Sequence, residues 1–421
     1  MPAGNNAQTI ASQKEWITPQ LELMYLTSSR LVKEIETNTD IHAISTRPAR
    51  VPLEILAGGK FRSNNPDGGS YGRGSGPSEV YGSISAVPFC QASEYTSLAE
   101  LATDGDEKAI KNYVALTNAR ATETYAMCQD AALAGGSGAN NLDTVVSTTT
   151  GGLVVNNANL FMDNQDIDVY SSLTGPSGFI ATVTIESVDI TNNTIWLTGA
   201  VPAGVTTGSY LVISGSAGVA NSGLFGLLYY QVSGNSGNIL GIQRSAYPGK
   251  LGTPGIAVNG ALTPSVVRTL EMLLKLQLGI DRADENDLIV HCGVDMQLAW
   301  ENNAILVQRV VANEVKGDQA TDMLKKEAVT VMAGRRIVAN ERAIPGRIDM
   351  LAIKKWSRVE TKALDYLEIG GQTLFPTYAI DGGVNSSYIF YLVQMLNYLN
   401  PSPRAGAFLS SVTVPKGLFG H

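Results

Sequence analysis

The sequence predicts an α+β protein with several parts, and three observations support this. Short segments that alternate apolar and polar residues are separated by glycine-rich turns, which favours strands. One long apolar stripe at helical spacing covers residues 110–133. Helices and short buried strands alternate over residues 263–353. The composition agrees, since 44% of the 421 residues are hydrophobic, 43 are glycine and only 16% are charged. That balance is typical of strands, turns and extended loops.

The first 50 residues are expected to form an arm. Pro19–Glu36 carries apolar residues at helical spacing and predicts a helix. The five bases of residues 1–50 equal the five acids. The segment alone lacks a core, so we expect it to project from the body and to pack on another surface.

Residues 51–91 predict a long hairpin. Val51–Ile55 and Glu79–Phe89 are both strand-like, and the span between them, Gly58 to Gly76, holds seven glycines. Two strands with a glycine-rich tip form a hairpin. Because an isolated two-stranded hairpin is only marginally stable in water, we expect it to lie on another surface, of this chain or of a neighbour.

A long helix and a small all-β unit are expected next. Asp104 or Asp106 can cap the helix and Gly135-Gly136 stops it. The helix then has about 29 residues and a length of roughly 43 Å. Residues 137–217 change to strand signals and polar turns, with strand-like runs at Phe179–Ile190, Thr194–Thr198 and Tyr210–Ser214.

The rest of the chain predicts an α/β region that ends in two long strands. Thr263-Pro264 starts a helix and Gly279 ends it, at the positions that proline and glycine favour. The elements expected after it are Leu288–Cys292, Asp295–Asn303, the hairpin of Val329–Met332 with Ile337–Val338, Met350–Ile353, Tyr388–Tyr398 and Ala407–Val414. The last two strands have no partners nearby in the sequence, so we expect them to pair with strands near residue 90.

The charge of the chain is concentrated in its middle. No Lys or Arg lies between Arg120 and Arg244, and this stretch holds eight acidic residues, which equals the whole net charge of −8. Nucleic acid would repel such a segment. The alternative is a small acidic domain with no particular partner, and the sequence leaves both interpretations open.

No motif indicates catalysis. GxSxG is absent, Gly59-Lys60 is followed by Phe61 and so forms no P-loop, and the glycines of 72–76 lack the setting of a phosphate cradle. His291 lies in a buried-looking strand, and its neighbour Cys292 faces the opposite side. We therefore expect no enzyme activity, no cofactor, and no catalytic or cofactor-binding residue.

Metal sites, disulfides and membrane spans are not expected either. Asp163, Asp166 and Asp168 crowd one turn, but their spacing is not that of an EF-hand, so a solvated acidic turn is favoured over calcium. No apolar run is long enough for a membrane span or a secretory signal. Three cysteines without a CxxC pair fit a reducing compartment; they are Cys90, Cys128 and Cys292.

In this order the elements resemble the major capsid protein of tailed double-stranded-DNA bacteriophages, with the Hong Kong 97-type capsid fold. Short stretches resemble it too: Asp189–Ile195 with Gly208–Ile213, Gly241–Pro248, and Asn400-Pro401. The resemblance implies these parts: an N-terminal arm (1–50), an E-loop hairpin (51–91), a P-domain with a spine helix (92–136 and 370–421), an all-β insertion (137–217) and an A-domain (218–369).

The resemblance also implies a function. The chain would assemble into hexamers and pentamers of an icosahedral or prolate capsid that encloses double-stranded DNA without sequence-specific contact. Its location would be the virion capsid, assembled in the host cytoplasm. Only about 50 residues precede the hairpin, so the scaffolding protein would be a separate chain; a portal and decoration proteins are further expected partners. The residues expected to contact neighbouring subunits lie in the hairpin: Lys60, Arg62, Arg73, Gly68 and Gly69.

Three alternatives remain open at this stage. An encapsulin-like compartment shell shares the fold but holds enzymes in place of a genome. A tail or adhesive β protein would consist mostly of strands, which the long helix and the α/β region contradict. An enzyme would need a deep pocket with converging titratable groups.

Overall fold

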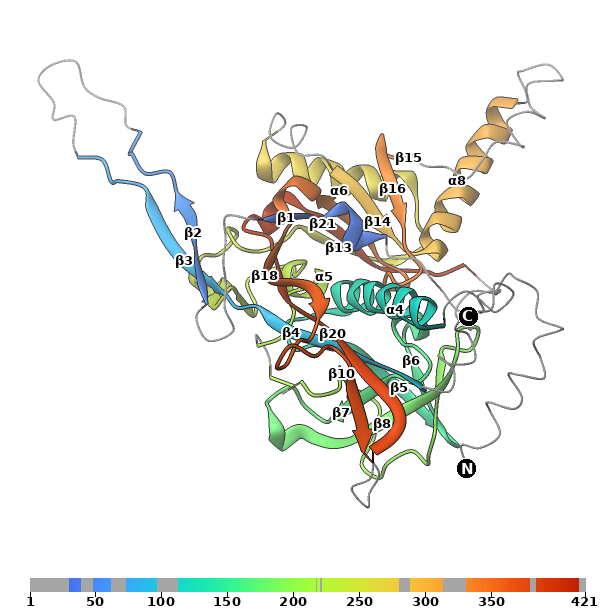
Figure 1. The fold of residues 1–421 in the computed structure, drawn as a ribbon. Coiled ribbons are helices and arrows are strands. Elements are labelled where there is room, and N and C mark those ends of the chain that lie inside the picture. The colour runs from blue at the N-terminus through green and yellow to red at the C-terminus, as the bar shows by residue number, and fades with distance from the viewer. Residues whose placement is uncertain are drawn as a thin grey trace, which may run out of the picture.

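The computed structural model describes residues 30–38, 48–61, 73–96, 113–216, 218–219, 222–279, 288–312, 331–378 and 384–415. The fold is α+β, as the sequence predicts. Figure 1 shows a long hairpin that projects from a layered body, a helix in the middle of the body, and a small barrel on the opposite side from the larger α/β layer.

The projecting hairpin consists of β2 (Ala49–Leu56) and β3 (Ser78–Ile84), which pair antiparallel. The sequence pattern predicts one strand over Glu79–Phe89, and this is wrong. The strand is interrupted at Ser85 and Ala86, and β4 (Val87–Thr96) follows. The reason is a change of partner: β3 pairs with β2, whereas β4 pairs with the C-terminal strand β20 (Val384–Leu399).

A five-stranded sheet is organised around β20, which pairs with β4, with β18 (Ser357–Tyr366) and with β19 (Phe375–Tyr378). Its register with β4 runs from Ser387 opposite Thr96 to Leu396 opposite Val87. The pairing predicted between the first terminal strand and the region near residue 90 is therefore confirmed.

The second terminal strand, β21 (Ala407–Val412), does not join this sheet, and that prediction is wrong. It pairs with β13 (Gly255–Gly260) and β17 (Ile348–Ala352) in a six-stranded sheet. A short 3₁₀ turn, Pro403–Ala405, redirects the chain between the two sheets. The remaining strands of the second sheet are β14 (Leu288–Cys292), β15 (Val331–Met332) and β16 (Arg335–Ala339).

Two helices accompany the six-stranded sheet. α6 (Pro264–Leu278) begins at Thr263, whose side chain accepts a hydrogen bond from the Val266 amide, as a helix N-cap does. Its buried face carries Val267, Leu270 and Leu274 and packs on the sheet core. α8 (Val294–Ala312) points away from the body (Figure 1).

The helix in the middle of the body is α4 (Tyr113–Gly135), whose 23 described residues span roughly 35 Å. The predicted start at Asp104 or Asp106 lies outside the described residues. The predicted end is confirmed. A Cβ atom at Gly135 would collide with the Leu142 carbonyl oxygen, and one at Gly136 with the Ala132 carbonyl oxygen. Glycine is therefore required where the chain leaves the helix.

A closed six-stranded barrel follows α4, inside the range where the sequence predicts an all-β unit. The strands neighbour one another in the order β10-β5-β6-β9-β8-β7, and residues 0% exposed such as Leu153, Ile185 and Ile195 fill the interior. Closure leaves no unpaired strand edge. The bounds are β5 (Asn141–Thr149), β6 (Gly152–Val155), β7 (Asp166–Tyr170), β8 (Phe179–Asp189), β9 (Thr194–Leu197) and β10 (Tyr210–Ile213).

Part of the predicted arm packs on its own chain. α2 (Leu31–Glu34) lies against α4, and β1 (Glu36–Asn38) pairs parallel with β18. Leu31 and Ile35 are buried in the main core. The prediction of a projecting arm is therefore wrong for residues 30–38, and the predicted helix Pro19–Glu36 is wrong at Glu36, which lies in a strand; residues 19–29 lie outside the described part of the chain.

The limits of the sheets differ from the domain ranges suggested by the sequence. The division at residue 91 falls inside β4. β18 lies in the range given to the A-domain but pairs with β20, and β21 lies in the range given to the P-domain but belongs to the six-stranded sheet. Strands that are distant in the sequence complete each sheet, and patterns within single segments do not reveal such pairings.

Candidate assembly surface

Residues 59–61 and 73–77, which the structure describes on either side of the hairpin tip, are exposed. Lys60 and Arg73, two of the predicted contact residues, are both exposed there, while Arg62, Gly68 and Gly69 lie outside the described residues. The two strands remain joined close to the tip, where the Gly59 amide donates to the Ser75 carbonyl oxygen at 2.6 Å.

Glycine is needed at the start of this tip. Gly58 has φ of +77°, and a Cβ atom there would lie 2.6 Å from the carbonyl carbon of Gly76. L-residues with side chains rarely adopt this backbone conformation. The glycine-rich composition therefore reflects a close approach of two backbones as well as conformational freedom.

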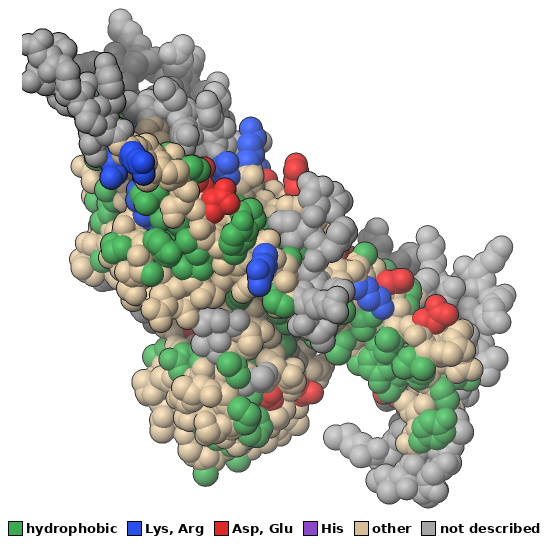
Figure 2. Space-filling model, turned by 90° about the vertical axis from the view of Figure 1, so that its left-hand side faces the viewer, with side chains coloured by type: hydrophobic (Ala, Val, Ile, Leu, Met, Phe, Trp, Pro, Cys, Tyr) green, Lys and Arg blue, Asp and Glu red, His purple; other side chains and the backbone are tan. Residues whose placement is uncertain are grey.

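The hairpin is buried at its base and exposes two large apolar side chains farther out. Val51, Leu53 and Ile84, near the body, are at most 6% exposed, whereas Leu56 is 54% and Phe61 105% exposed. Two large apolar side chains exposed on a projecting element make the hairpin a candidate for protein contact. Figure 2 shows one face of the molecule, on which hydrophobic side chains form several patches and charged side chains are sparse.

Hydrogen bonds among Ser83, Leu240 and Tyr229, which we call the root of the hairpin, join it to the body. The Ser83 amide donates to the Leu240 carbonyl oxygen at 2.8 Å, and the Leu240 amide donates to the Tyr229 hydroxyl at 2.7 Å. Burial raises the pKa of Tyr229 to about 12, so the hydroxyl stays neutral. The Gly241–Pro248 stretch that carries part of the resemblance begins directly after Leu240.

Arg244, from the same stretch, is buried and donates hydrogen bonds to neutral carbonyl oxygens. Its guanidinium donates to the Leu251 carbonyl oxygen at 2.6 Å and to the Tyr229 carbonyl oxygen at 2.7 Å. These bonds satisfy buried carbonyl groups at the root, and desolvation lowers the pKa of Arg244 from its ordinary value.

Asp130 ties three parts of the chain together. Its Oδ1 accepts hydrogen bonds from the amides of Leu31 and Val32, at 2.9 and 3.0 Å, and its Oδ2 accepts from Asn340 Nδ2 at 2.8 Å. The carboxylate thus caps the start of α2 and links it to α4 and to the end of β16. This role was not predicted from the sequence, although a carboxylate among the apolar residues of a helix is a signal that could have shown it.

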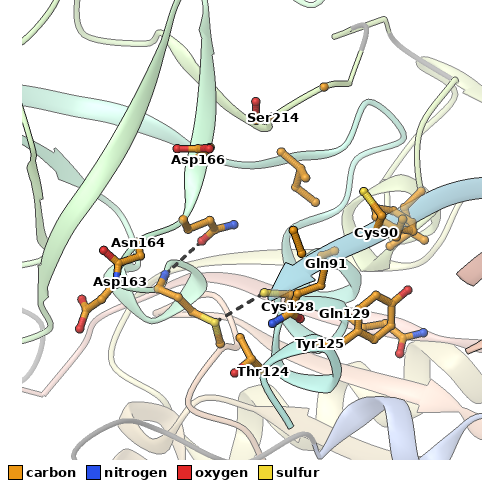
Figure 3. A pocket seen from close by; sticks show the side chains of 18 residues that line it. Cys90, Gln91, Thr124, Tyr125, Cys128, Gln129, Asp163, Asn164, Asp166 and Ser214 are labelled. Atoms are coloured by element: carbon orange, nitrogen blue, oxygen red, sulfur yellow. Dashed lines mark hydrogen bonds between the residues drawn. The ribbon is translucent and has the colours of Figure 1, made fainter. Parts of the chain in front are cut away.

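A pocket of about 600 Å³ lies between β4, α4 and the barrel (Figure 3). Cys90 and Gln91 reach it from β4, and Tyr125 and Cys128 from α4. The Cys128 thiol contacts the Met162 sulfur at 3.5 Å, and burial raises the pKa of Cys128 to about 11. The lining also contains Phe89, Ala92, Thr124, Gln129, Ala132, Asp163, Asn164, Gln165, Asp166, Ile213, Ser214, Gly215 and Leu224.

The three aspartates considered as calcium ligands accept hydrogen bonds from different parts of the barrel. Asp163 accepts a hydrogen bond from the Val188 amide, and Asp166 accepts one from the Thr184 hydroxyl. Asp168 is buried and accepts from the hydroxyls of Thr182 and Ser214 and from the Gly215 amide. No group of three or more potential metal-ligating side chains occurs within the residues that the structure describes. These carboxylates therefore stabilise the barrel.

His291 and Cys292 are buried in β14. His291 Nδ1 lies 3.9 Å from Asp349 Oδ2, which is too long for a direct hydrogen bond, and Nε2 lies 3.4 Å from Asn340 Nδ2. Burial raises the pKa of Cys292 to about 12, so its thiol stays protonated at neutral pH. This arrangement holds no activated nucleophile.

No family model and no curated protein matches the chain. Among solved structures, a chain of the Cyanophage A-1(L) capsid is 12% identical, with a TM-score of 0.56, and the match covers 94% of this chain and 96% of that chain. The capsid of the native GTA particle is 12% identical with a TM-score of 0.49 and coverage of 98% and 100%. The SrpI encapsulin from Synechococcus elongatus PCC 7942 is 9% identical with a TM-score of 0.45 and coverage of 97% and 96%.

The first of these similarities extends over nearly the whole of both chains and shows the fold. The chain has the capsid fold of tailed bacteriophages, which agrees with the order of elements in its sequence.

Proposed function

We propose that this chain is the structural subunit of an icosahedral or prolate virus capsid, assembled from hexamers and pentamers around double-stranded DNA. The observation that carries the proposal is the projecting hairpin, whose base is buried in its own chain while its outer end exposes Leu56 and Phe61. Burying such side chains stabilises a contact by about 1.5–3 kcal/mol each, and a neighbouring subunit is the surface that every copy of a shell has available.

A shell can be built from contacts in which the hairpin of one copy meets a different surface of the next copy. Each copy extends one hairpin and offers the rest of its surface to the hairpin of another copy. Contacts between two different patches form rings when the rotation closes. A stable contact of this kind buries more than about 1,200 Å² in total.

The partners follow from this role. The acidic middle segment disfavours close contact with nucleic acid, so packaged DNA would be held without sequence-specific contacts. A separate scaffolding protein, a portal and decoration proteins complete the proposed assembly, in a virion formed in the host cytoplasm. In the described part of the chain, no helix is long and apolar enough to cross a membrane. The proposed role is structural and includes no enzyme activity.

The barrel would lie on the outer side of the shell or away from its lumen. It carries six acidic residues and no base within residues 137–217. Charges within a Debye length of the DNA, about 8 Å at physiological salt, would be repelled. Protease treatment or antibody labelling of filled particles tests this placement. Protection of the barrel until the particles are opened would contradict it.

Electron microscopy of the purified chain tests the main proposal. Closed particles are expected from the wild type, and a deletion of residues 58–76 should leave a folded subunit that forms none. A matched control keeps Lys60, Phe61 and Arg73 and replaces the other residues of 58–76 by an equal number of Gly and Ser residues. Normal particles from the deletion variant would contradict the role of the hairpin. Double-stranded DNA in particles from the native source supports a capsid, whereas enzyme cargo would indicate an encapsulin-like shell.

A further inference from the structure

Two short elements bring exposed lysines to one end of a strand pair. α2 leads into β1, and the 3₁₀ turn Ile353–Lys355 leads into β18. Because β1 and β18 run parallel, with Glu36 opposite Ser357, the two elements that precede them lie at the same end of the pair. The exposed lysines of α2 and of the turn are Lys33, Lys354 and Lys355.

Arg336 of β16 adds a base to this end. Its guanidinium donates two hydrogen bonds to the Glu34 carboxylate of α2, at 2.9 and 2.6 Å. The Arg336 side chain is 56% exposed, so this bidentate pair lies at the surface and neutralises Glu34. Arg30, directly before α2, is exposed as well. We call these residues the basic end: Arg30, Lys33, Arg336, Lys354 and Lys355.

The lysines of the basic end are not neutralised by carboxylates. Within the residues that the structure describes, Lys33, Lys354 and Lys355 form no ion pair. Two carboxylates of α2 and β1, Glu34 and Glu36, stand against the five bases. The local charge is therefore +3, whereas the whole chain carries −8. Like charges that are held together repel one another, and a polyanion relieves this repulsion.

The basic end is separated from the acidic barrel. Figure 1 shows β1 and β16 on one side of α4 and the barrel strands β5, β7 and β8 on the other side. At physiological salt, charges act over about 8 Å. The local charge therefore decides which partner this surface attracts, although the net charge of the chain is negative.

We infer that the basic end contacts the phosphate backbone of double-stranded DNA and faces the lumen of the shell. The inference rests on the proposed function and names the surface that meets the packaged DNA. Lysine is a compact point charge, and contacts to phosphates carry no sequence information. The contact is therefore independent of sequence, and it weakens as salt rises because each neutralised phosphate releases condensed counterions.

Salt-dependent binding of a short duplex to the purified chain, followed by fluorescence anisotropy, tests the inference. The double variant Lys354→Gln, Lys355→Gln removes two cations, so the slope of log affinity against log salt should become about 1.8 smaller in magnitude. If the affinities coincide at 1 M salt, this slope means roughly 60-fold weaker binding at 0.1 M. The matched control Lys60→Gln, Lys250→Gln removes the same charge from exposed sites outside the basic end and should change the slope far less.

Acetylation of lysines by a small reagent gives a second readout, which needs no variant. Duplex DNA should slow the acetylation of Lys33, Lys354 and Lys355 severalfold and leave that of Lys250 unchanged. Equal slopes for the two double variants, or equal acetylation with and without DNA, would overturn the inference. Tighter binding of polyglutamate than of the duplex at equal salt would indicate an acidic protein as the partner and would also overturn it.

Failure of this inference can be distinguished from failure of the proposed function. Closed particles from a wild-type chain whose basic end fails these tests would overturn the inference alone. A wild-type chain that binds DNA through the basic end but forms no closed particles would contradict the proposed function instead.

Discussion

Replacing Asp130 by alanine should release α2 from the body while the hairpin and barrel stay intact. The carboxylate accepts two amide hydrogen bonds from α2 and one from Asn340. Loss of a helix N-cap costs about 0.5–2 kcal/mol, and a buried donor left without a partner costs about 1–3 kcal/mol. We expect a loss of about 2–4 kcal/mol in the free energy that holds residues 31–38 in place.

Limited trypsin digestion measures this release, since Arg30 directly precedes the segment and Lys33 lies within it. Every 1.4 kcal/mol changes an equilibrium constant tenfold, so the open population and the cleavage rate should rise about 30- to 700-fold. Asp130→Asn retains an oxygen that can accept the amide bonds and should show a smaller rise. Asp163→Ala, which removes one hydrogen bond at an exposed site, is the control. An unchanged cleavage rate in Asp130→Ala would refute the capping role.

Two further predictions concern the hairpin root and the thiols. A Cβ atom at Gly82 would lie 2.7 Å from the Leu240 Cβ, so Gly82→Val should lower the unfolding free energy by about 1–3 kcal/mol in urea titrations. Gly76→Val, where a Cβ meets nothing, should change it little, and equal effects would contradict the packed root. At pH 8, maleimide should label Cys90 but not Cys128 or Cys292, because burial raises the pKa of the last two to about 11 and 12. Labelling of Cys128 and Cys292 should stay far below that of Cys90, and equal labelling of the three thiols at pH 8 would contradict the raised pKa values.

Local patterns in the sequence predicted most elements but not all of their partners. The alternation and the glycine tip predicted a hairpin, and Gly135-Gly136 predicted the end of α4, because both signals depend on residues close in the chain. The interruption at Ser85 and Ala86 was missed, since it arises where the strand changes partners between two sheets. β21 was assigned to the wrong sheet for the same reason.

Of the hairpin tip and the pocket, only the tip was predicted from the sequence. The exposed bases Lys60 and Arg73 follow from the composition of the tip. The pocket could not be predicted, because Cys90, Tyr125 and Met162 come from three elements that are separated by 35 residues or more along the chain and meet only in the folded body. The docking of residues 31–38 depends likewise on Asp130 and Asn340, which local patterning does not connect.

The aspartates of the barrel stabilise its structure and also give it a negative charge. The sequence offered two interpretations of its carboxylates, a charged surface or a segment whose charge has no consequence. Asp163, Asp166, Asp168 and Asp189 accept hydrogen bonds from amides and hydroxyls of the barrel itself. These donors are neutral, so the hydrogen bonds stabilise the carboxylate form without cancelling its charge; the pKa of Asp189 is lowered by its bonds to Asn192. No Lys or Arg between residues 121 and 243 neutralises them. The negative field therefore persists although the carboxylates are structural, and the reason to expect the barrel away from packaged DNA remains.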